Sequence, residues 1–253
     1  MNVLLPTNPV TRIGALALLT TPLMVTVDWL SAVVVIAFTV CMVPLCGMGY
    51  ATFVRRALPL ALLAPIAGVP MALYGQSGGQ VHLDWGLIQV SDLSLSLAVA
   101  VALRVFAIAL PVIVLAANVD PTDLGDGLAQ VLHLPERFVI GTVAALRMLS
   151  LLSDDLEALR RSRRARGIAD TGRIRYWFSL AFGLLVMSLR RAGKLSTAME
   201  ARGFGRFASR TWARTSRLQR RDGVVLVVCL LVGLGALAAA YAAGTLRPVW
   251  AVG

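Results

Sequence analysis

Two tripeptides contain the residues best suited to binding a partner, because Ala165–Gly167 and Ala201–Gly203 both have the sequence Ala-Arg-Gly. The planar guanidinium of arginine can bind a carboxylate through two parallel hydrogen bonds. Glycine can end a helix in the left-handed conformation without strain, and alanine keeps the helix end narrow enough for a groove to approach its backbone. We therefore predict that each tripeptide is a helix end that inserts one charged side chain into an acidic groove.

A simpler explanation exists for any one of these arginines. A cation near the C-terminus of a helix offsets the helix dipole and contributes about 0.3–1 kcal/mol without any partner. Arginine also accumulates on the cytoplasmic side of membrane proteins whether or not it binds a partner. Two identical ends, each closing a long helix in the same basic block, favour docking over this explanation.

The other residues that could carry chemistry do not form a catalytic or metal-binding pattern. Cys41, Cys46 and Cys229 lie in apolar runs and lack the spacing of metal ligands or of a disulfide framework. His82 and His133 are isolated in the sequence. We find no phosphate-binding loop, nucleophile elbow or carboxylate pair. The chain is therefore not expected to be an enzyme or to hold a metal or cofactor.

The composition predicts a membrane protein built from helices. Of 253 residues 58% are hydrophobic, and the mean hydropathy is +0.78, which is unusual for a soluble domain. Apolar runs long enough to cross a bilayer predict about five transmembrane helices. These runs are Ile13–Val27, Trp29–Val54, Ala57–Tyr74, Leu93–Ala117 and Gly223–Ala243. The first run is expected to be a retained span, since no cleavage site of a signal peptide stands out after it.

The distribution of charge predicts the topology. Of the 24 Lys and Arg residues, 17 lie in the range Ala158–Arg221, where only Asp170 and Glu200 are acidic. The positive-inside rule places this block in the cytoplasm, together with Arg55–Arg56. The loop Gly75–Asp92 contains no Lys or Arg and is expected on the outside. The chain would then begin inside and end outside.

The cytoplasmic block is predicted to contain three helices. The first begins at Asp120–Pro121, a capping residue followed by a proline suited to the first turn, and stops at His133–Pro135. The second runs over Glu136–Arg166, about 45 Å at 1.5 Å per residue. The third covers Tyr176–Gly203. The second and third helices are apolar in their first half and basic in their second half, and each ends in Ala-Arg-Gly.

Several segments of this block share the motifs of one transporter family. They are Asp120–Leu124, Leu132–Pro135, Ala145–Leu152, Arg163–Gly167 and Ala198–Gly205. In these segments the chain resembles the transmembrane (T) component of energy-coupling factor (ECF) transporters, which are ABC-type importers of vitamins and transition-metal ions. The N-terminal spans resemble the family in layout only, except that Arg104 lies where the family often has an arginine. The chain departs from the family at Ala117–Asn118, where two threonines are common, and at Ser150, where proline is common.

The resemblance implies a coupling subunit. The two long helices would be coupling helices, with Arg166 in a groove of one cytoplasmic ABC ATPase subunit and Arg202 in a groove of a second. They would pass ATP-driven motion to a separate membrane-embedded substrate-binding (S) component. Glu200 and Arg147 are supporting candidates, and Arg104 would contact either backbone carbonyls or the S component. The chain itself would bind neither ATP nor the vitamin or metal ion.

The expected fold is an all-α, polytopic membrane protein of a bacterial or archaeal plasma membrane. Residues 1–117 form a membrane domain with four spans embedded in the lipid bilayer. Residues 118–222 form the cytoplasmic coupling-helix region. Residues 223–253 form the final span and a short tail.

Other functions remain open from the sequence. The arginines in the range Arg206–Arg221 recur at spacings of three and four and would share one helical stripe. Such a stripe suits anionic lipid headgroups, or another acidic partner without an ATPase, better than nucleic acid. A self-sufficient transporter with its own substrate site would use Arg104, the only ionisable residue within a clear span. The cargo is not identified, because specificity would reside in another polypeptide.

Overall fold

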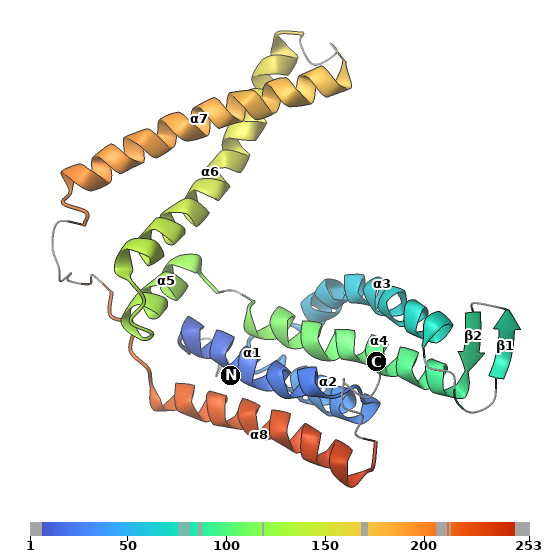
Figure 1. The fold of residues 1–253 in the computed structure, drawn as a ribbon. Helices are drawn as coiled ribbons and strands as arrows, with labels where there is room; N and C mark the ends of the chain where they lie inside the picture. Colours follow the sequence, from blue (N-terminus) through green and yellow to red (C-terminus); the bar gives the residue numbers. More distant parts are fainter. Residues whose placement is uncertain are drawn as a thin grey trace. The chain divides into compact units, whose positions relative to one another are not determined.

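The chain folds into two units, a membrane unit and a long-helix unit (Figure 1). The structure is a computed structural model that describes residues 7–75, 78, 81–85, 88–117, 119–167, 172–205, 212 and 214–245. The membrane unit consists of Met1–Asp120 and Arg217–Gly253. The long-helix unit consists of Pro121–Ser216.

Helices make up most of both units. In the membrane unit they are α1 (Pro9–Val25), α2 (Trp29–Met42), α3 (Tyr50–Tyr74), α4 (Asp92–Leu115) and α8 (Arg220–Ala242), with strands β1 (Val81–Trp85) and β2 (Ile88–Ser91). In the long-helix unit they are α5 (Pro121–Gln130), α6 (Glu136–Ala165) and α7 (Arg173–Ala201). The all-α membrane class is confirmed, and the two strands form only one short hairpin.

Three helices of the membrane unit, α3, α4 and α8, are long and apolar enough to cross a bilayer, and α1 and α2 are shorter apolar helices. At 1.5 Å per residue α2 is about 21 Å long, less than the hydrocarbon core of about 30 Å. The prediction of a single run over Trp29–Val54 is wrong, because α2 ends at Met42 and α3 begins at Tyr50. As a result Arg55–Arg56 lie in the second turn of α3 and not between two spans.

The break between α2 and α3 has a local cause. Proline and glycine occur together in this segment, at Pro44, Gly47 and Gly49. Gly47 is left-handed, with φ of 69°, and its N–H donates to the carbonyl of Pro44 at 3.2 Å. This tight turn ends α2 even though the surrounding residues stay apolar, so hydropathy alone does not show it.

An antiparallel hairpin occupies part of the segment predicted as an external loop. β1 pairs with β2 from Leu83 opposite Val90 to Trp85 opposite Ile88, with an irregularity after Val81. Val81, Leu83 and Trp85 alternate with two polar residues, which is the two-residue period of a strand. That alternation is the signal that indicates the hairpin, but it spans only five residues.

Small residues allow the membrane helices to approach closely. A Cβ added to Gly233 of α8 would lie 3.1 Å from Cγ of Pro22 and 3.2 Å from the carbonyl oxygen of Leu18, both on α1. A Cβ added to Gly68 of α3 would lie 2.9 Å from the carbonyl oxygen of Ala98 on α4. Helix association in a bilayer depends on such close packing, because lipid tails are as apolar as leucine. The core among α1, α2, α4 and α8 contains Leu19, Val35, Ala107, Cys229 and Ala236.

A buried carboxylate joins the starts of two helices in the membrane unit. Asp222, in the first turn of α8, is 1% exposed, and its Oδ1 accepts a hydrogen bond from the N–H of Asn8 at 2.9 Å. Its Oδ2 accepts from the N–H of Gln219 at 2.7 Å. Arg12 of α1 donates to the carbonyl of Ala117, beyond α4, at 3.5 Å. These contacts hold the ends of α1, α4 and α8 together.

The close contact of α8 with α1 leads to a stability prediction. Gly233→Leu places a side chain against the backbone of α1, and such overpacking typically costs about 1–3 kcal/mol. Gly235→Leu is the matched control, because a Cβ at Gly235 meets nothing within 4 Å. Thermal unfolding in detergent should show a lower midpoint for Gly233→Leu than for Gly235→Leu. Equal midpoints would contradict the close packing of these two helices.

Candidate functional site

The long helices end at the predicted tripeptides, which we call the first tip (Ala165–Gly167) and the second tip (Ala201–Gly203). α6 ends at the alanine of the first tip and α7 at the alanine of the second, so each arginine is the C-cap. Arg166 has φ −90° and ψ 4°, and Arg202 has φ −85° and ψ 7°. The glycine that follows is left-handed in both tips, with φ of 68° and 77°. The two tips therefore share one backbone conformation.

Hydrogen bonds explain why each tip ends in glycine. In the second tip the N–H of Gly203 donates to the carbonyl of Glu200 at 2.9 Å, and the N–H of Phe204 donates to that of Met199 at 3.0 Å. This pair of bonds is a Schellman motif, which requires a left-handed residue after the C-cap. In the first tip the glycine N–H makes the corresponding bond at 3.1 Å, and residues 168–171 beyond it lie outside the described residues.

The side chains of the two arginines are available to a partner. Arg166 and Arg202 are both exposed. Among the residues that the structure describes, neither guanidinium donates a hydrogen bond or forms an ion pair. A free guanidinium just beyond a helix end can bind a carboxylate through two hydrogen bonds. Both tips thus present a free guanidinium at an exposed helix end.

The three residues predicted to support partner binding lie in different parts of the structure. Glu200 is next to the second tip, and its Oε1 accepts a hydrogen bond from Ser196 Oγ at 3.3 Å. Arg147 is exposed on α6, about 28 Å along the helix from Arg166 at 1.5 Å per residue, so it is not part of the first tip. Arg104 belongs to the membrane unit, where its guanidinium donates to the carbonyl of Leu23. That carbonyl is one of the last four of α1, which a helix end leaves without intrahelical donors.

α6 and α7 run in opposite directions and cross within the long-helix unit (Figure 1). Asp155 of α6 binds Arg191 of α7 through two nitrogen–oxygen contacts, at 2.9 Å and 3.1 Å. Arg163 of α6 donates to the hydroxyl of Ser179 and, at 2.7 Å, to its carbonyl oxygen. Arg163 belongs to the same family motif as the first tip, yet the structure assigns it a partner within the unit and leaves Arg166 free.

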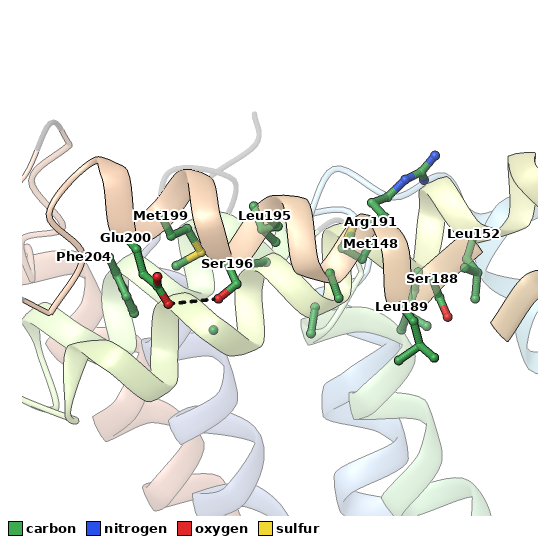
Figure 2. A pocket seen from close by; sticks show the side chains of 15 residues that line it. Met148, Leu152, Ser188, Leu189, Arg191, Leu195, Ser196, Met199, Glu200 and Phe204 are labelled. Carbon is green, nitrogen blue, oxygen red and sulfur yellow. Dashed lines mark hydrogen bonds between the residues drawn. The ribbon is translucent and has the colours of Figure 1, made fainter. Parts of the chain in front are cut away.

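An apolar groove lies between the first half of α6 and the second half of α7, with a volume of about 630 Å³. Its lining from α6 is Gly141, Ala144, Ala145, Met148, Leu149 and Leu152, and its lining from α7 and beyond is Ser188, Leu189, Arg191, Ala192, Leu195, Ser196, Met199, Glu200 and Phe204. Figure 2 shows the bonded pair of Ser196 and Glu200 beside Phe204 toward one end of the groove, and Arg191 with Leu152 toward the other.

The sequence motifs described above do not predict this groove. The signal that could have found it is the helical spacing of three, four and seven residues among Gly141, Ala144, Ala145 and Met148. A stripe of small residues on one helix indicates close approach or an open space, and only the position of the second helix distinguishes the two. Here α7 stands away from the stripe, so the space stays open.

The described part of the Arg-rich tail does not form a helical stripe. Residues 206–211 lie outside the described residues, and residues 214–219 are non-helical. The predicted single stripe is therefore wrong for residues 214–219. The physical reason is Gln130 of α5, whose side-chain amide donates to the carbonyl of Arg214 at 2.9 Å and accepts from the N–H of Ser216 at 2.8 Å. These two bonds pair the carbonyl of Arg214 and the N–H of Ser216 outside a helix.

Comparison with known proteins identifies the family. A model of the CbiQ family, described as cobalt transport protein, matches residues 2–212. The chain belongs to the CbiQ family. The energy-coupling factor transporter transmembrane protein EcfT of Listeria innocua is 28% identical to it over 222 residues, 83% of this chain and 82% of that protein. EcfT of Brevibacillus brevis is 26% identical over 193 residues (72% and 73%), and EcfT of Exiguobacterium sibiricum is 30% identical over 172 residues (63% and 64%).

Membership of the CbiQ family confirms the resemblance to the T components of ECF transporters. The chain is thus an energy-coupling component of a membrane transporter. The matched residues include α5, α6, α7 and both tips, whereas α8 lies beyond them. The part of the chain with the two tips is therefore within the family match.

The left-handed glycine of the second tip leads to a test in this CbiQ-family chain. Gly203→Ala forces an L-residue into the left-handed region, at a cost of about 1–2 kcal/mol. Hydrogen exchange of the N–H groups of residues 203 and 204 should accelerate roughly 5- to 30-fold, since 1.4 kcal/mol is a factor of ten. Gly193→Ala is the control, because Gly193 lies inside α7 with open space around it. Unchanged exchange in Gly203→Ala would contradict the Schellman geometry.

Proposed function

We propose that this chain couples two cytoplasmic ABC ATPase subunits to a membrane-embedded substrate-binding component, with one tip docked on each ATPase. The observation that supports this proposal is the pair of tips, two helix ends with one backbone conformation and a free, exposed guanidinium. Arg166 enters a groove of one ATPase subunit and Arg202 a groove of the other. ATP hydrolysis belongs to these partner subunits, and the chain itself catalyses no reaction.

The strength expected of such a contact follows from its chemistry. A groove that holds a carboxylate removes the guanidinium from water and forms a charge-assisted pair of hydrogen bonds. Truncating one partner of a buried pair of this kind costs about 2–5 kcal/mol, part of which is the charge left unpaired. At 1.4 kcal/mol per factor of ten, loss of one arginine corresponds to roughly 30- to 4,000-fold weaker binding at that tip.

The substrate-binding component would contact the apolar halves of the long helices. Large apolar side chains are exposed on both helices, among them Leu149 on α6 at 61% and Phe178 on α7 at 74%. By contrast, Val139 and Leu180 are the buried large apolar residues of the described parts of α6 and α7. Exposed apolar surface on this scale marks a surface that binds membrane or protein. A membrane-embedded partner suits it, and the cargo of that partner would be a vitamin or a transition-metal ion.

The location that fits this function is a bacterial or archaeal plasma membrane, with the long-helix unit in the cytoplasm. The support comes from charge, since 17 of the 24 basic residues lie between residues 158 and 221. A basic block of this kind stays on the cytoplasmic side under the positive-inside rule. ATP and the ATPase subunits are on that same side.

A second function has one observation in its favour. Arg217, Arg220 and Arg221 are exposed around the start of α8, a helix long and apolar enough to cross a bilayer. Arginines at this position can contact anionic lipid headgroups, each contributing about 1 kcal/mol near an anionic surface. Lipid binding by these residues, without an ATPase, is the alternative to coupling. It does not account for two tips of identical conformation.

Co-purification with ATPases tests the proposal. The chain is co-expressed with ABC ATPase subunits from the same organism, and wild type is compared with the double variant Arg166→Glu/Arg202→Glu. We expect wild type to retain the ATPases in high salt and the double variant to lose them, because charge reversal at both tips repels the acidic grooves.

Arg217→Glu is the control for general charge, since it makes the same change outside the tips. Equal loss of ATPases from Arg217→Glu would indicate a diffuse electrostatic effect. If wild type retains no ATPase, or if the double variant retains as much as wild type, the tips are not docking points and lipid binding becomes the better explanation.

A further inference from the structure

The two long helices contact each other through a compact set of side chains at their crossing. Besides the pair of Asp155 with Arg191, the guanidinium of Arg160 lies over the ring of Trp177, 5.2 Å from its centroid. A Cβ added to Gly183 of α7 would lie 3.0 Å from a methyl carbon of Leu159 on α6. Together with the bonds from Arg163 to Ser179, these contacts cover residues 155–163 of α6 and 177–191 of α7.

The pair of Asp155 with Arg191 differs from the other described ion pairs of the long-helix unit. The side chains of Asp155 and Arg191 are 17% and 36% exposed, whereas those of the other two pairs are 52–74% exposed. Each oxygen of the carboxylate faces its own guanidinium nitrogen, at 2.9 Å and 3.1 Å. Of these two contacts, the one from Nη2 to Oδ1 has hydrogen-bond geometry, and the one from Nη1 to Oδ2 is an ion contact without it. A partly buried pair with a charge-assisted hydrogen bond links the two helices more strongly than an exposed pair does. The exposed ion pairs contribute little to stability by comparison.

Outside the crossing, α6 and α7 are separated by the groove. At its far end, among the residues that the structure describes, Arg137 of α6 donates a hydrogen bond to the carbonyl of Gly205, just beyond α7, at 3.0 Å, and both residues are exposed. A single exposed hydrogen bond between flexible groups constrains an angle weakly. The angle between the helices therefore depends mainly on the side chains at the crossing.

The tips lie at unequal distances from this crossing. From Leu159 to Arg166, α6 extends about 10 Å, and from Gly183 to Arg202, α7 extends about 28 Å, at 1.5 Å per residue. A change of about 15° in the crossing angle would displace Arg202 by about 7 Å relative to α6. Productive contacts tolerate roughly 0.5 Å and 10–20°. The side chains at the crossing thus determine whether both tips can reach their grooves at once.

We propose that Asp155 and Arg191, with Arg163 and Ser179, are positioning residues that fix the crossing angle of α6 and α7 and so preset the spacing of the two tips for simultaneous binding to two ATPase subunits. This inference rests on the proposed function. Simultaneous binding by two linked sites raises the overall affinity by about 10²- to 10⁴-fold over either site alone, and it is lost when geometry prevents the second contact. Because the positioning residues act on the crossing of α6 and α7, their effect on binding passes through the spacing of the tips.

Charge reversal at the crossing tests this inference. The variants are Asp155→Arg, Arg191→Asp and the double exchange Asp155→Arg/Arg191→Asp, each titrated with the purified ABC ATPase subunits in detergent. We expect each single variant to bind the ATPase pair at least tenfold more weakly than wild type, and the double exchange to recover most of that loss because it restores an opposite-charge pair. Glu157→Arg is the control, since it makes the same change two residues away on an exposed side chain.

A second comparison distinguishes positioning from a general loss of structure. In the background Arg166→Glu only one tip can bind, so the spacing of the tips no longer matters. Asp155→Arg should then cause no further loss of ATPase binding, although it causes at least tenfold loss when both tips are intact. A general defect of folding would lower binding equally in both backgrounds.

The outcomes separate this inference from the proposed function. If wild type does not bind the ATPases, the proposed function is wrong. If wild type binds and Asp155→Arg binds equally well, the tips still dock but the crossing does not set their spacing, and this inference alone is overturned. It is also overturned if Asp155→Arg weakens binding equally in the one-tip background, or if the double exchange recovers nothing.

Discussion

Close approach between helices is the constraint on which both units depend. Gly233 brings α8 against α1 in the membrane unit, while Gly125 brings α5 and Gly183 brings α7 against α6 in the long-helix unit. In the membrane unit, apolar helix surfaces gain little from one another in a bilayer, so van der Waals contact at points such as Gly233 decides which helices pair. Polar groups then bind where the helices are already close. Asp222 joins the starts of α1 and α8, and Asp155 joins α6 to α7.

The two units use their apolar residues in opposite ways. The membrane unit has a buried core that includes Leu19, Val35 and Cys229. The long-helix unit leaves side chains such as Phe178 and Leu189 exposed, and at their crossing α6 and α7 contact each other through charged side chains as well as through Gly183 and Leu159. A unit of this kind keeps its own shape with few buried groups while offering apolar surface to other components. This division suits a part that transmits motion between partners.

The sequence predicts the ends of α6 and α7 well because those ends are encoded locally. Glycine after the last turn specifies a left-handed residue, and α6 and α7 end at Ala165 and Ala201, within one and two residues of the predicted ends. The break at Gly47 is harder to predict, since hydropathy stays high across it. The contact of Asp155 with Arg191 and the groove beside it join positions far apart in the chain. Such contacts depend on how two helices cross, and no local sequence pattern predicts that crossing. The hydrogen bonds from Gln130 to the Arg-rich tail are likewise long-range and cannot be predicted from the local sequence.

The end of α8 shows that the glycine and the arginine of each tip have separate roles. The N–H of Gly244 donates to the carbonyl of Tyr241 at 3.1 Å and that of Thr245 to Ala240 at 3.1 Å, the same hydrogen-bond pattern as in the second tip, after a helix that ends without arginine. A left-handed glycine thus ends α8 as it ends α6 and α7, and the arginine is the feature that distinguishes the two tips from the end of α8. In a genetic screen the two classes of allele should therefore separate. Changes at the glycines should be partly tolerated when asparagine replaces them, because asparagine also enters the left-handed region, whereas changes at Arg166 and Arg202 should leave a folded protein that fails to assemble.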